Sequence, residues 1–217
     1  MRIGTWNLDC RLPTVNHRKI LHEGDCDIWF LTELNPKWLD SNGRVGDYRC
    51  HHSDGVMGRK QYWAAILSRQ SVIPLNDPHP ASAVVMMNGI TYCSTILPWR
   101  GVKTVESPWE GANHSAKTEA AIKSLLTELP KNNLVWGGDW NHSLIGPEVA
   151  GSKGGREHLL KAIACLNLQV PTAVLKHRND ICNAIDHIGV PCNWKIAKCE
   201  RIIALGLSDH DAYVVEI

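Results

Sequence analysis

The stretch GGDWNHSL occupies residues 137–144 and directly follows the apolar run LVW at residues 134–136. This run is short and rich in β-branched and aromatic residues, so it predicts the end of a buried strand. Asp139 and Asn141 are two positions apart, so their side chains should point to the same side of an extended chain, with Trp140 pointing toward the core. A turn does not need both an acid and an amide at this spacing. We therefore ask whether other predicted strands also end in polar residues.

Apolar runs of strand length recur along the chain. They lie at residues 2–6, 27–34, 62–68, 82–87, 90–97, 133–138, 184–190 and 212–217. The Asn-Gly pair in MMNGIT, residues 86–91, predicts a tight hairpin between two of these strands. Helical spacing of apolar residues is found at residues 14–24, 114–130 and 155–168. Strands mixed with a few helices, with hairpins present, predict a layered α/β fold.

The composition is that of one globular domain. The chain has 217 residues, 44% of them hydrophobic, and no repeat, linker or low-complexity segment, so we expect residues 1–217 to form a single domain. Lys and Arg (23) nearly balance Asp and Glu (22), which argues against a histone-like protein but leaves nucleic acid open as a substrate. The sequence shows neither a membrane-span pattern nor a signal-peptide pattern, so we expect a cytoplasmic location. The eight cysteines lack zinc-finger spacing, and we expect them to be reduced.

Polar residues occur at the ends of several predicted strands. Asn7 ends the first strand in GTWNLD, and Glu33 ends the second in FLTELN. Asp186 interrupts AIDHIGV, and Asp209 and His210 precede the last strand. Any one of these residues alone would be read as a cap or turn residue, but their joint occurrence at strand ends indicates a site.

The residue types in this set suit one kind of chemistry. Oxygen ligands from the first two strand ends and from Asp209 match the preference of a hard cation such as Mg²⁺. His210 lies beside an acid and can titrate near neutrality. Asp139 and Asn141 can hold a water molecule and a charged oxygen. Together these residues predict metal-assisted hydrolysis of a phosphate ester.

The ordered set TWN, LTE, GGDWN, AIDHI and SDH resembles the signature of the endonuclease/exonuclease/phosphatase superfamily, whose members include deoxyribonuclease I and the inositol polyphosphate 5-phosphatases. The motifs run from residue 5 to residue 210 in the family's order, and AAILSR at 64–69 resembles its third-strand motif. The resemblance implies a deoxyribonuclease I-like, four-layered α/β sandwich, in which two mixed β-sheets pack face to face and helices flank them. It also implies Mg²⁺ or Mn²⁺ as the cofactor.

The resemblance further implies a role for each site residue. The expected metal ligands are Asn7, Glu33 and Asp209. Asp139 would orient or deprotonate the attacking water, and Asn141 would contact the scissile phosphate. His210 would stabilise a phosphate oxygen, with Asp186 holding its imidazole ring, and His210 as the base remains an alternative. His187 should point away from Asp186 by strand alternation, which indicates a packing role.

Substrate contacts are expected on the rim of the site. Nuclease members commonly carry a His or Tyr after the strand at 90–97, where this chain has Ile96 and Leu97 followed by a Trp-Arg pair. The residues interpreted as substrate-binding are Arg59, Tyr62, Trp99 and Arg100. They would supply positive charge to a phosphate and aromatic faces to a base or sugar, and a solvated or packed rim is the alternative. Residues 176–178, Lys-His-Arg, form a further basic run.

Three functions are compatible with this sequence. The leading hypothesis is a metal-dependent phosphodiesterase acting on nucleic acid, either DNA or RNA, with no obligate protein partner. The alternative is a phosphomonoesterase or small-molecule phosphodiesterase, of phosphoinositide or nucleotide type, on the same fold, which the short chain favours. The third is a catalytically silent binding module, against which the intact set of strand-end residues counts.

Overall fold

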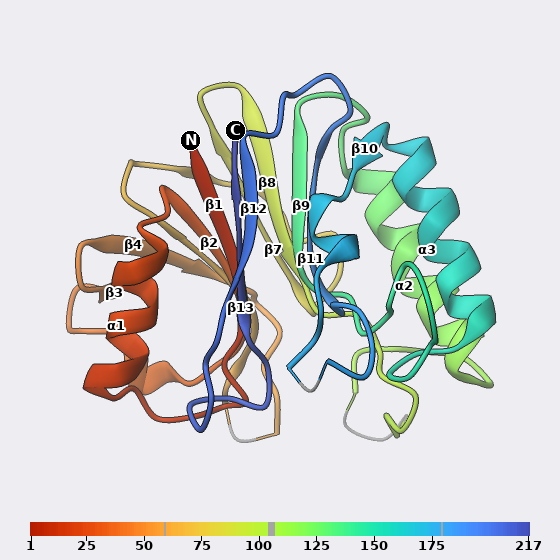
Figure 1. The fold of residues 1–217 in the computed structure, drawn as a ribbon, viewed down its shortest axis with the longest axis horizontal. Coiled ribbons are helices and arrows are strands. Elements are labelled where there is room, and N and C mark those ends of the chain that lie inside the picture. Colours follow the sequence, from red (N-terminus) through yellow and green to blue (C-terminus); the bar gives the residue numbers. More distant parts are fainter. Residues whose placement is uncertain (59, 104–106, 179) are drawn as a thin grey trace.

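The computed structural model describes residues 1–58, 60–103, 107–178 and 180–217. Within these residues the strands form two mixed β-sheets that pack face to face, and helices cover both outer faces (Figure 1). Helix α1 (Val15–Gly24) lies on one outer face, and α2 (His114–Glu128) and α3 (Lys153–Cys165) lie together on the other. The predicted four-layered α/β sandwich is therefore confirmed.

The first sheet has the strand order β12-β13-β1-β2-β5-β4-β3 in the described chain. Its strands are β1 (Arg2–Asn7), β2 (Ile28–Leu34), β3 (Arg44–Val45), β4 (Tyr48–His52), β5 (Tyr62–Ser68), β12 (Lys198–Ile202) and β13 (Ala212–Glu216). Strands β1 and β2 are parallel, whereas β13 and β1 are antiparallel. Strand β2 is buried along almost its whole length, which accounts for its nearly continuous apolar sequence IWFLTEL.

The second sheet has the order β10-β11-β9-β8-β7-β6. Its strands are β6 (Ile73–Pro74), β7 (Ser82–Met87), β8 (Ile90–Thr95), β9 (Leu134–Asp139), β10 (Leu168–Gln169) and β11 (Asp186–Pro191). Asn88 and Gly89 join β7 to β8 with φ angles of 53° and 75°, as an Asn-Gly hairpin requires, so the predicted turn is confirmed.

The helices begin where side chains cap them. Thr14, Asn113 and Ser152 each accept a hydrogen bond from a backbone N–H in the first turn of α1, α2 and α3. The third helix was expected to reach residue 168, but it ends at Cys165, because Leu168 pairs with Pro191 in β10. Two short 3-10 helices, η1 (Pro36–Trp38) and η2 (Pro171–Val174), lie in the connections.

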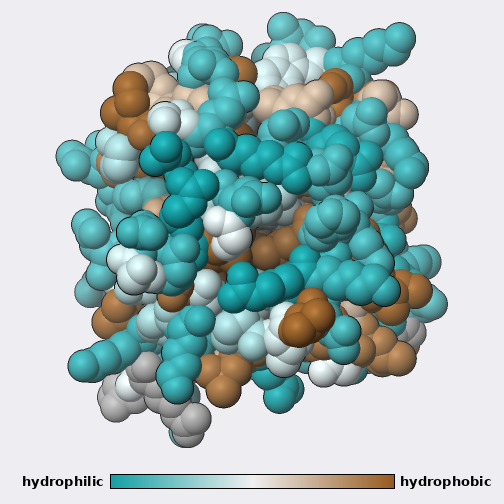
Figure 2. Space-filling view, turned by 90° about the vertical axis from the view of Figure 1, so that its left-hand side faces the viewer, coloured by the Kyte–Doolittle hydropathy of each residue, from teal (hydrophilic) through white to brown (hydrophobic). Residues whose placement is uncertain are grey.

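Hydrophobic clusters fill the spaces between the layers. The cluster between the two sheets includes Ile3, Phe30, Ile66, Val85 and Ile188. The cluster under α1 is rich in tryptophan, and that beneath α2 and α3 contains further tryptophans from the second sheet. On the side of the molecule that bears α1, the surface is largely hydrophilic and hydrophobic residues form separate small areas (Figure 2). In the described residues no helix is long and apolar enough to cross a membrane.

The topology gathers the predicted polar residues at one end of the sandwich. Because β1 and β2 are parallel, Asn7 and Glu33 at their carboxyl ends lie side by side. In the second sheet β9 and β11 are antiparallel with Asp139 opposite Asp186, so the end of one strand meets the start of the other. Strand β13 runs antiparallel to β1, which brings His210 in the preceding loop to the same end.

Candidate active site

Two glycines shape the strand end from which Asp139 projects. Gly138 has a φ of 119°, and a Cβ atom there would lie 2.2 Å from the Thr95 carbonyl oxygen. A Cβ on Gly137 would lie 2.3 Å from the Phe30 ring of the facing sheet. The sequence GG before the acid therefore permits both an unusual backbone turn and close packing of the two sheets.

Asp139 and Asn141 are fixed to each other and to the neighbouring strand. The Asn141 backbone N–H donates to Asp139 Oδ1 at 2.9 Å, and Asn141 Nδ2 donates to the Leu97 carbonyl at 2.9 Å. Trp140 is fully buried, with its ring centroid 4.3 Å from that of Trp136. The expected division, polar residues to one side and Trp140 to the core, is confirmed.

Asn7 connects the two carboxylates nearest to it. Its Nδ2 donates to Asp139 Oδ2 at 2.9 Å and to Glu33 Oε1 at 3.1 Å, and its Oδ1 accepts the Asp9 N–H at 2.8 Å. Glu33 has a φ of 54°, and Asp9, Cys10 and Asn141 also lie in the left-handed region. Backbone strain of this kind concentrates at functional sites, where the surrounding structure holds it.

His210 is oriented by Asp186. Its Nδ1 lies 2.6 Å from Asp186 Oδ2, so Nδ1 carries a proton that it donates to the carboxylate. Nε2 then faces the site, 4.0 Å from Asp139 Oδ2 and 3.8 Å from Asp209 Oδ1. The His210 N–H donates to Ser208 Oγ, which donates in turn to the Asn7 carbonyl at 2.7 Å. The loop that carries His210 is thus tied to β1.

Burial and neighbouring charge change the acidity of these groups. Burial raises the pKa of Asp139, the negative charge of Asp186 raises it further, and the result is about 8. Burial also raises the pKa of Glu33. Burial alone would lower the pKa of His210, but the carboxylates of Asp186 and Asp139 outweigh it and hold that pKa well above its ordinary value. At neutral pH His210 is therefore a cation that can donate from Nε2.

These groups surround a cavity of about 470 Å³. Its lining includes Glu33, Met57, Trp99, Arg100, Asp139, Asn141, Asp209 and His210. The Arg100 guanidinium donates to the Gly151 carbonyl from Nε at 2.8 Å and from Nη2 at 2.6 Å. The structure therefore brings three of the four predicted catalytic residues, Asp139, Asn141 and His210, and two of the predicted substrate-binding residues to one cavity. Asp186 and the predicted metal ligand Asn7 are buried and are not among the described residues that line it.

The other two predicted substrate-binding residues are not placed there. Tyr62 stacks on His52, with ring centroids 3.6 Å apart, and is not among the described residues that line the cavity. Arg59 lies outside the described residues. Burial of Ile96 and Leu97 shows that this segment supports the site from below, since Leu97 holds Asn141 through its carbonyl.

The carboxylates at this cavity fit a hard divalent cation. Glu33 and Asp209 both line it, and each increases the negative potential at the other, as the pKa of Glu33 records. The Asp209 side chain is 62% exposed, so its oxygens can be reached from the cavity. A carbonyl oxygen has two lone pairs, so Asn7 Oδ1 keeps one for a cation while it accepts from Asp9.

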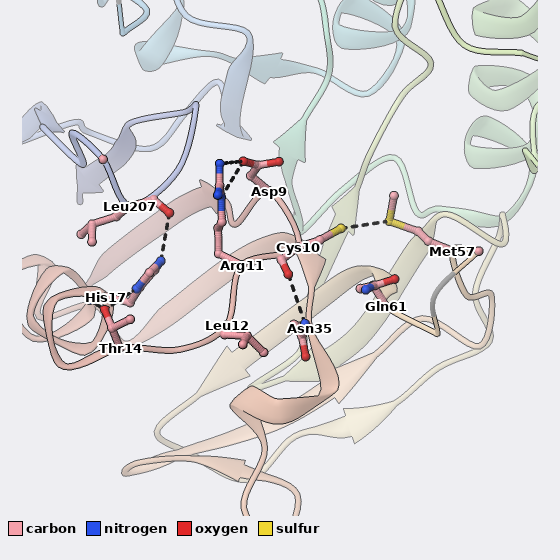
Figure 3. A pocket seen from close by; sticks show the side chains of 12 residues that line it. Asp9, Cys10, Arg11, Leu12, Thr14, His17, Asn35, Met57, Gln61 and Leu207 are labelled. Atoms are coloured by element: carbon pink, nitrogen blue, oxygen red, sulfur yellow. Dashed lines mark hydrogen bonds and ion pairs between the residues drawn. The ribbon is translucent and has the colours of Figure 1, made fainter.

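Sequence reasoning missed a second cavity, of about 990 Å³, beside the first. It lies between the loop after β1, the residues Met57, Gly58 and Gln61, and the loop before β13 (Figure 3). Met57 lines both cavities. Arg11 contributes a guanidinium paired with Asp9 at 2.8 Å. Cys10 Sγ lies 3.5 Å from Glu33 Oε2. Positive φ values at Asp9 and Cys10 make this loop turn back toward the site, and nothing in the sequence LDC indicates that turn.

The histidines adjoining the motifs pack in the interior, as expected of His187. His187 is fully buried, its Nε2 donates to the His142 carbonyl at 2.9 Å, and its Nδ1 accepts from Thr172 Oγ1 at 3.1 Å. His142 is also fully buried and donates from Nδ1 to the Trp140 carbonyl. Neither histidine is among the described residues that line the cavity.

Comparison with known proteins gives a consistent result. A model of the Endonuclease/Exonuclease/phosphatase family matches residues 4–210. An AP endonuclease from Archaeoglobus fulgidus has a TM-score of 0.77 at 16% identity, covering 100% of this chain and 99% of that chain. The endonuclease domain of TRAS1, a telomere-specific non-LTR retrotransposon, has a TM-score of 0.71 at 19% identity, covering 100% and 97%. The 3' phosphatase NExo from Neisseria, bound to a product DNA hairpin, has a TM-score of 0.67 at 18% identity, covering 100% and 99%. No curated protein sequence matches this chain.

Proposed function

Because the chain belongs to the endonuclease/exonuclease/phosphatase family, we propose that it is a divalent-metal-dependent phosphodiesterase that cleaves DNA or RNA. The observation that carries this proposal is the convergence of Glu33, Asp139, Asn141, Asp209 and His210 on one cavity. In addition, Asp186 is placed to orient His210. A binding module would have no use for a buried, hydrogen-bonded dyad beside an acid whose pKa is close to neutrality.

In the proposed mechanism, Asp139 handles the attacking water. Its Oδ1 and Oδ2 are fixed by the Asn141 N–H and by Asn7 Nδ2, so the carboxylate has one orientation. Burial and the charge of Asp186 raise the pKa of Asp139, so its ionised carboxylate, beside the cationic His210, is a stronger base toward water than an ordinary aspartate. The oxygen of that water then forms a bond to phosphorus, and the bond from phosphorus to the leaving oxygen breaks.

His210 and Asn141 stabilise the phosphate during this step. Protonated His210 donates from Nε2 to a phosphate oxygen, where negative charge increases in the transition state. Asp186 maintains both the charge and the orientation of the ring. Because the raised pKa makes His210 an acid at neutral pH, we propose that Asp139, rather than His210, is the base.

The proposed ligands of the divalent cation are Asn7, Glu33 and Asp209. When bound, Mg²⁺ or Mn²⁺ would polarise the phosphoryl oxygen and neutralise charge on the leaving oxygen. The two carboxylates also need a counter-charge, since the cation His210, which acts on Glu33, already serves Asp186 and Asp139.

A nucleic acid is the preferred substrate for three reasons. Trp99 offers an aromatic face and Arg100 a positive charge on the wall of the catalytic cavity, as stacking of a base and binding of a backbone phosphate require. The cavity of about 990 Å³ continues past Met57, which provides room for more than one nucleotide. The similar structures are an AP endonuclease, a retrotransposon endonuclease domain and a phosphatase bound to a DNA hairpin.

A phosphomonoesterase is the second candidate. It is favoured by the structural similarity to the 3' phosphatase from Neisseria, which has the same fold and nearly the same extent. Such an enzyme would release inorganic phosphate from a DNA end and would leave internal bonds intact.

A substrate panel tests both candidates. Purified protein is incubated with plasmid DNA, single-stranded DNA, RNA and a 3'-phosphorylated oligonucleotide, each with Mg²⁺, with Mn²⁺ and with EDTA. Metal-dependent shortening or nicking supports the nuclease, and release of inorganic phosphate without cleavage supports the phosphatase. No metal-dependent reaction on any member of the panel would overturn the proposed function.

A further inference from the structure

A third side chain completes a cluster with the His210–Asp186 pair. His177, in the segment between η2 and β11, has its ring centroid 5.1 Å from that of His210, at an interplanar angle of 75°. His177, Asp186 and His210 each present one ligand atom, and these atoms lie within 4.8 Å of one another. The mechanism proposed above uses Asp186 and His210 but gives no task to His177.

Two atoms of this cluster are buried without a hydrogen-bond partner in the described chain. They are Asp186 Oδ1 and His177 Nδ1. Asp186 is completely buried, and an unsatisfied carboxylate oxygen in such a place is costly unless a donor or a cation reaches it. His177 Nδ1 is therefore a buried nitrogen beside the pair that can serve as a ligand atom.

The backbone at His177 is held in place rather than loosely attached. Its N–H donates to the Cys182 carbonyl at 3.0 Å, and its carbonyl accepts from Arg201 Nη1 at 2.9 Å. The backbone carbonyl of the neighbouring Lys176 accepts a hydrogen bond from the Tyr213 hydroxyl at 3.1 Å. The imidazole is therefore anchored beside the pair, with its ligand atom within 4.8 Å of those of Asp186 and His210.

We propose that His177, Asp186 and His210 form a site for a borderline transition-metal ion, of which Zn²⁺ is the representative, and that its occupation inhibits the enzyme. Two imidazole nitrogens and one carboxylate oxygen, with water as a fourth ligand, are a ligand set that Zn²⁺ favours and Mg²⁺ does not. This site is separate from the oxygen-rich ligands at Glu33 and Asp209. One of its ligands is the His210 imidazole, which stabilises the phosphate in the proposed mechanism.

Inhibition follows from what the ion displaces. To bind it, His210 Nδ1 releases its proton to solvent, and the hydrogen bond to Asp186 Oδ2 is replaced by two bonds to the ion. Because Nδ1 and Asp186 Oδ2 now lie 2.6 Å apart, too close for both to bind a tetrahedral ion, the His210 ring must move from its present position, and Nε2 moves with it. Asp209 and Asp211 also lie close enough to act on His177 electrostatically, so the local potential attracts a divalent ion.

Binding is tested with Co²⁺ as a visible probe that substitutes for Zn²⁺. The protein is first freed of bound metal and then placed in excess Mg²⁺. Co²⁺ is added in steps, and the intense d–d absorption typical of four-coordinate Co²⁺ is recorded. We expect His177→Ala to weaken Co²⁺ binding by at least about tenfold. Loss of a residue that merely hydrogen-bonds a metal ligand already weakens binding by about that factor, and His177 would be a ligand itself. His177→Cys keeps a ligand and should retain binding.

The matched control is His158→Ala, which removes a histidine on α3 that lies 3.8 Å from Glu119, in the outer helix layer. It should leave the Co²⁺ titration unchanged. Equal Co²⁺ affinity in wild type, His177→Ala and His158→Ala would overturn the site.

The inhibition half of this inference rests on the proposed function and has its own readout. With Mg²⁺ in excess, Zn²⁺ should inhibit the wild type at concentrations at least about tenfold lower than those needed for His177→Ala. His177-dependent Co²⁺ binding without Zn²⁺ inhibition would confirm the site and overturn the inhibition. Absence of activity in all proteins would count against the proposed function alone, since the Co²⁺ titration still decides the site.

Discussion

Asp186 Oδ2 lies 2.6 Å from Nδ1 of His210, although Asp186 begins a strand of one sheet and His210 precedes a strand of the other. The pair therefore exists only when the two sheets are packed face to face. The same is true of the hydrogen bond from Asn7 to Asp139, which joins the ends of β1 and β9. The geometry of the candidate site is thus a direct product of the sandwich, and it should be lost together with the fold.

The substitution Asp186→Asn tests the role of this pair. It keeps the size of the side chain but removes the charge that raises the pKa of His210, so the ring loses its proton near neutral pH. We expect kcat to fall by about 10²–10⁴-fold, the range usual for a group of this kind, with a much smaller change in KM. Steady-state kinetics give the values, and an unchanged kcat would show that His210 does not depend on Asp186.

Gly138→Ala and Gly146→Ala form a matched pair that tests the shape of the strand end. Gly138 combines a φ of 119° with a Cβ position 2.2 Å from the Thr95 oxygen, whereas Gly146 has a φ of 70° and open space around it. We expect Gly146→Ala to lower the free energy of unfolding by about 1 kcal/mol and Gly138→Ala by more than about 2 kcal/mol. The free energies of unfolding are measured in urea. Equal decreases in the two variants would contradict this prediction.

Arg100→Ala tests the predicted contact with a backbone phosphate. The guanidinium lines the candidate cavity, and within the described chain it donates hydrogen bonds to the neutral Gly151 carbonyl, so its charge can act on the substrate. We expect weaker binding of every nucleic acid tested and a slope of log K against log salt that is smaller by about 1. Lys123→Ala on the outer face of α2 is the control and should leave the slope unchanged.

The burial of His79 leads us to expect that the protein loses stability in acid. It is 8% exposed, burial lowers its pKa to about 4, and its Nδ1 accepts the Ala81 N–H at 3.1 Å, so folding requires the neutral ring. Its contribution to stability is fully present above pH 6.5 and is lost as pH falls toward 4, a change of about 3 kcal/mol. His79→Asn keeps an acceptor that does not titrate. Between pH 7 and pH 4 its unfolding free energy should fall less than that of the wild type, and an identical decrease would contradict this assignment.

The long elements of the fold were predictable because their sequences carry enough local information. Strand β2, with its apolar run, and the Asn-Gly hairpin are specified by neighbouring residues alone. Strands β10 and β6 have only two residues each, and β12, KCERI, is mostly polar and half-exposed. Their sequences therefore show no alternation of apolar and polar residues from which a strand could be predicted. These strands form because a longer neighbour offers its edge.

The site was predictable in its residues but not in its connections. Asn7 was expected as a metal ligand, and the structure adds that its amide joins Glu33 to Asp139, a contact that depends on the packing of the sheets. The basic run at residues 176–178 was interpreted as solvated surface charge, with a place on the rim of the site as the alternative. In the structure Lys176 Nζ donates to Asn183 and Arg178 Nη1 donates to the Ser208 carbonyl, so both charges hold loops together. Only three-dimensional contact shows that His177 belongs beside His210.

The most direct test of the central claim is the rate of metal-dependent phosphodiester cleavage by wild type, Asp139→Ala and His210→Ala on the same nucleic acid. The variants should retain cooperative unfolding, because the altered groups lie at the strand ends rather than in the hydrophobic clusters. We predict that cleavage by the wild type stops in EDTA and that each variant is slower by at least about 10²-fold. Near wild-type cleavage by either folded variant would contradict the proposed mechanism.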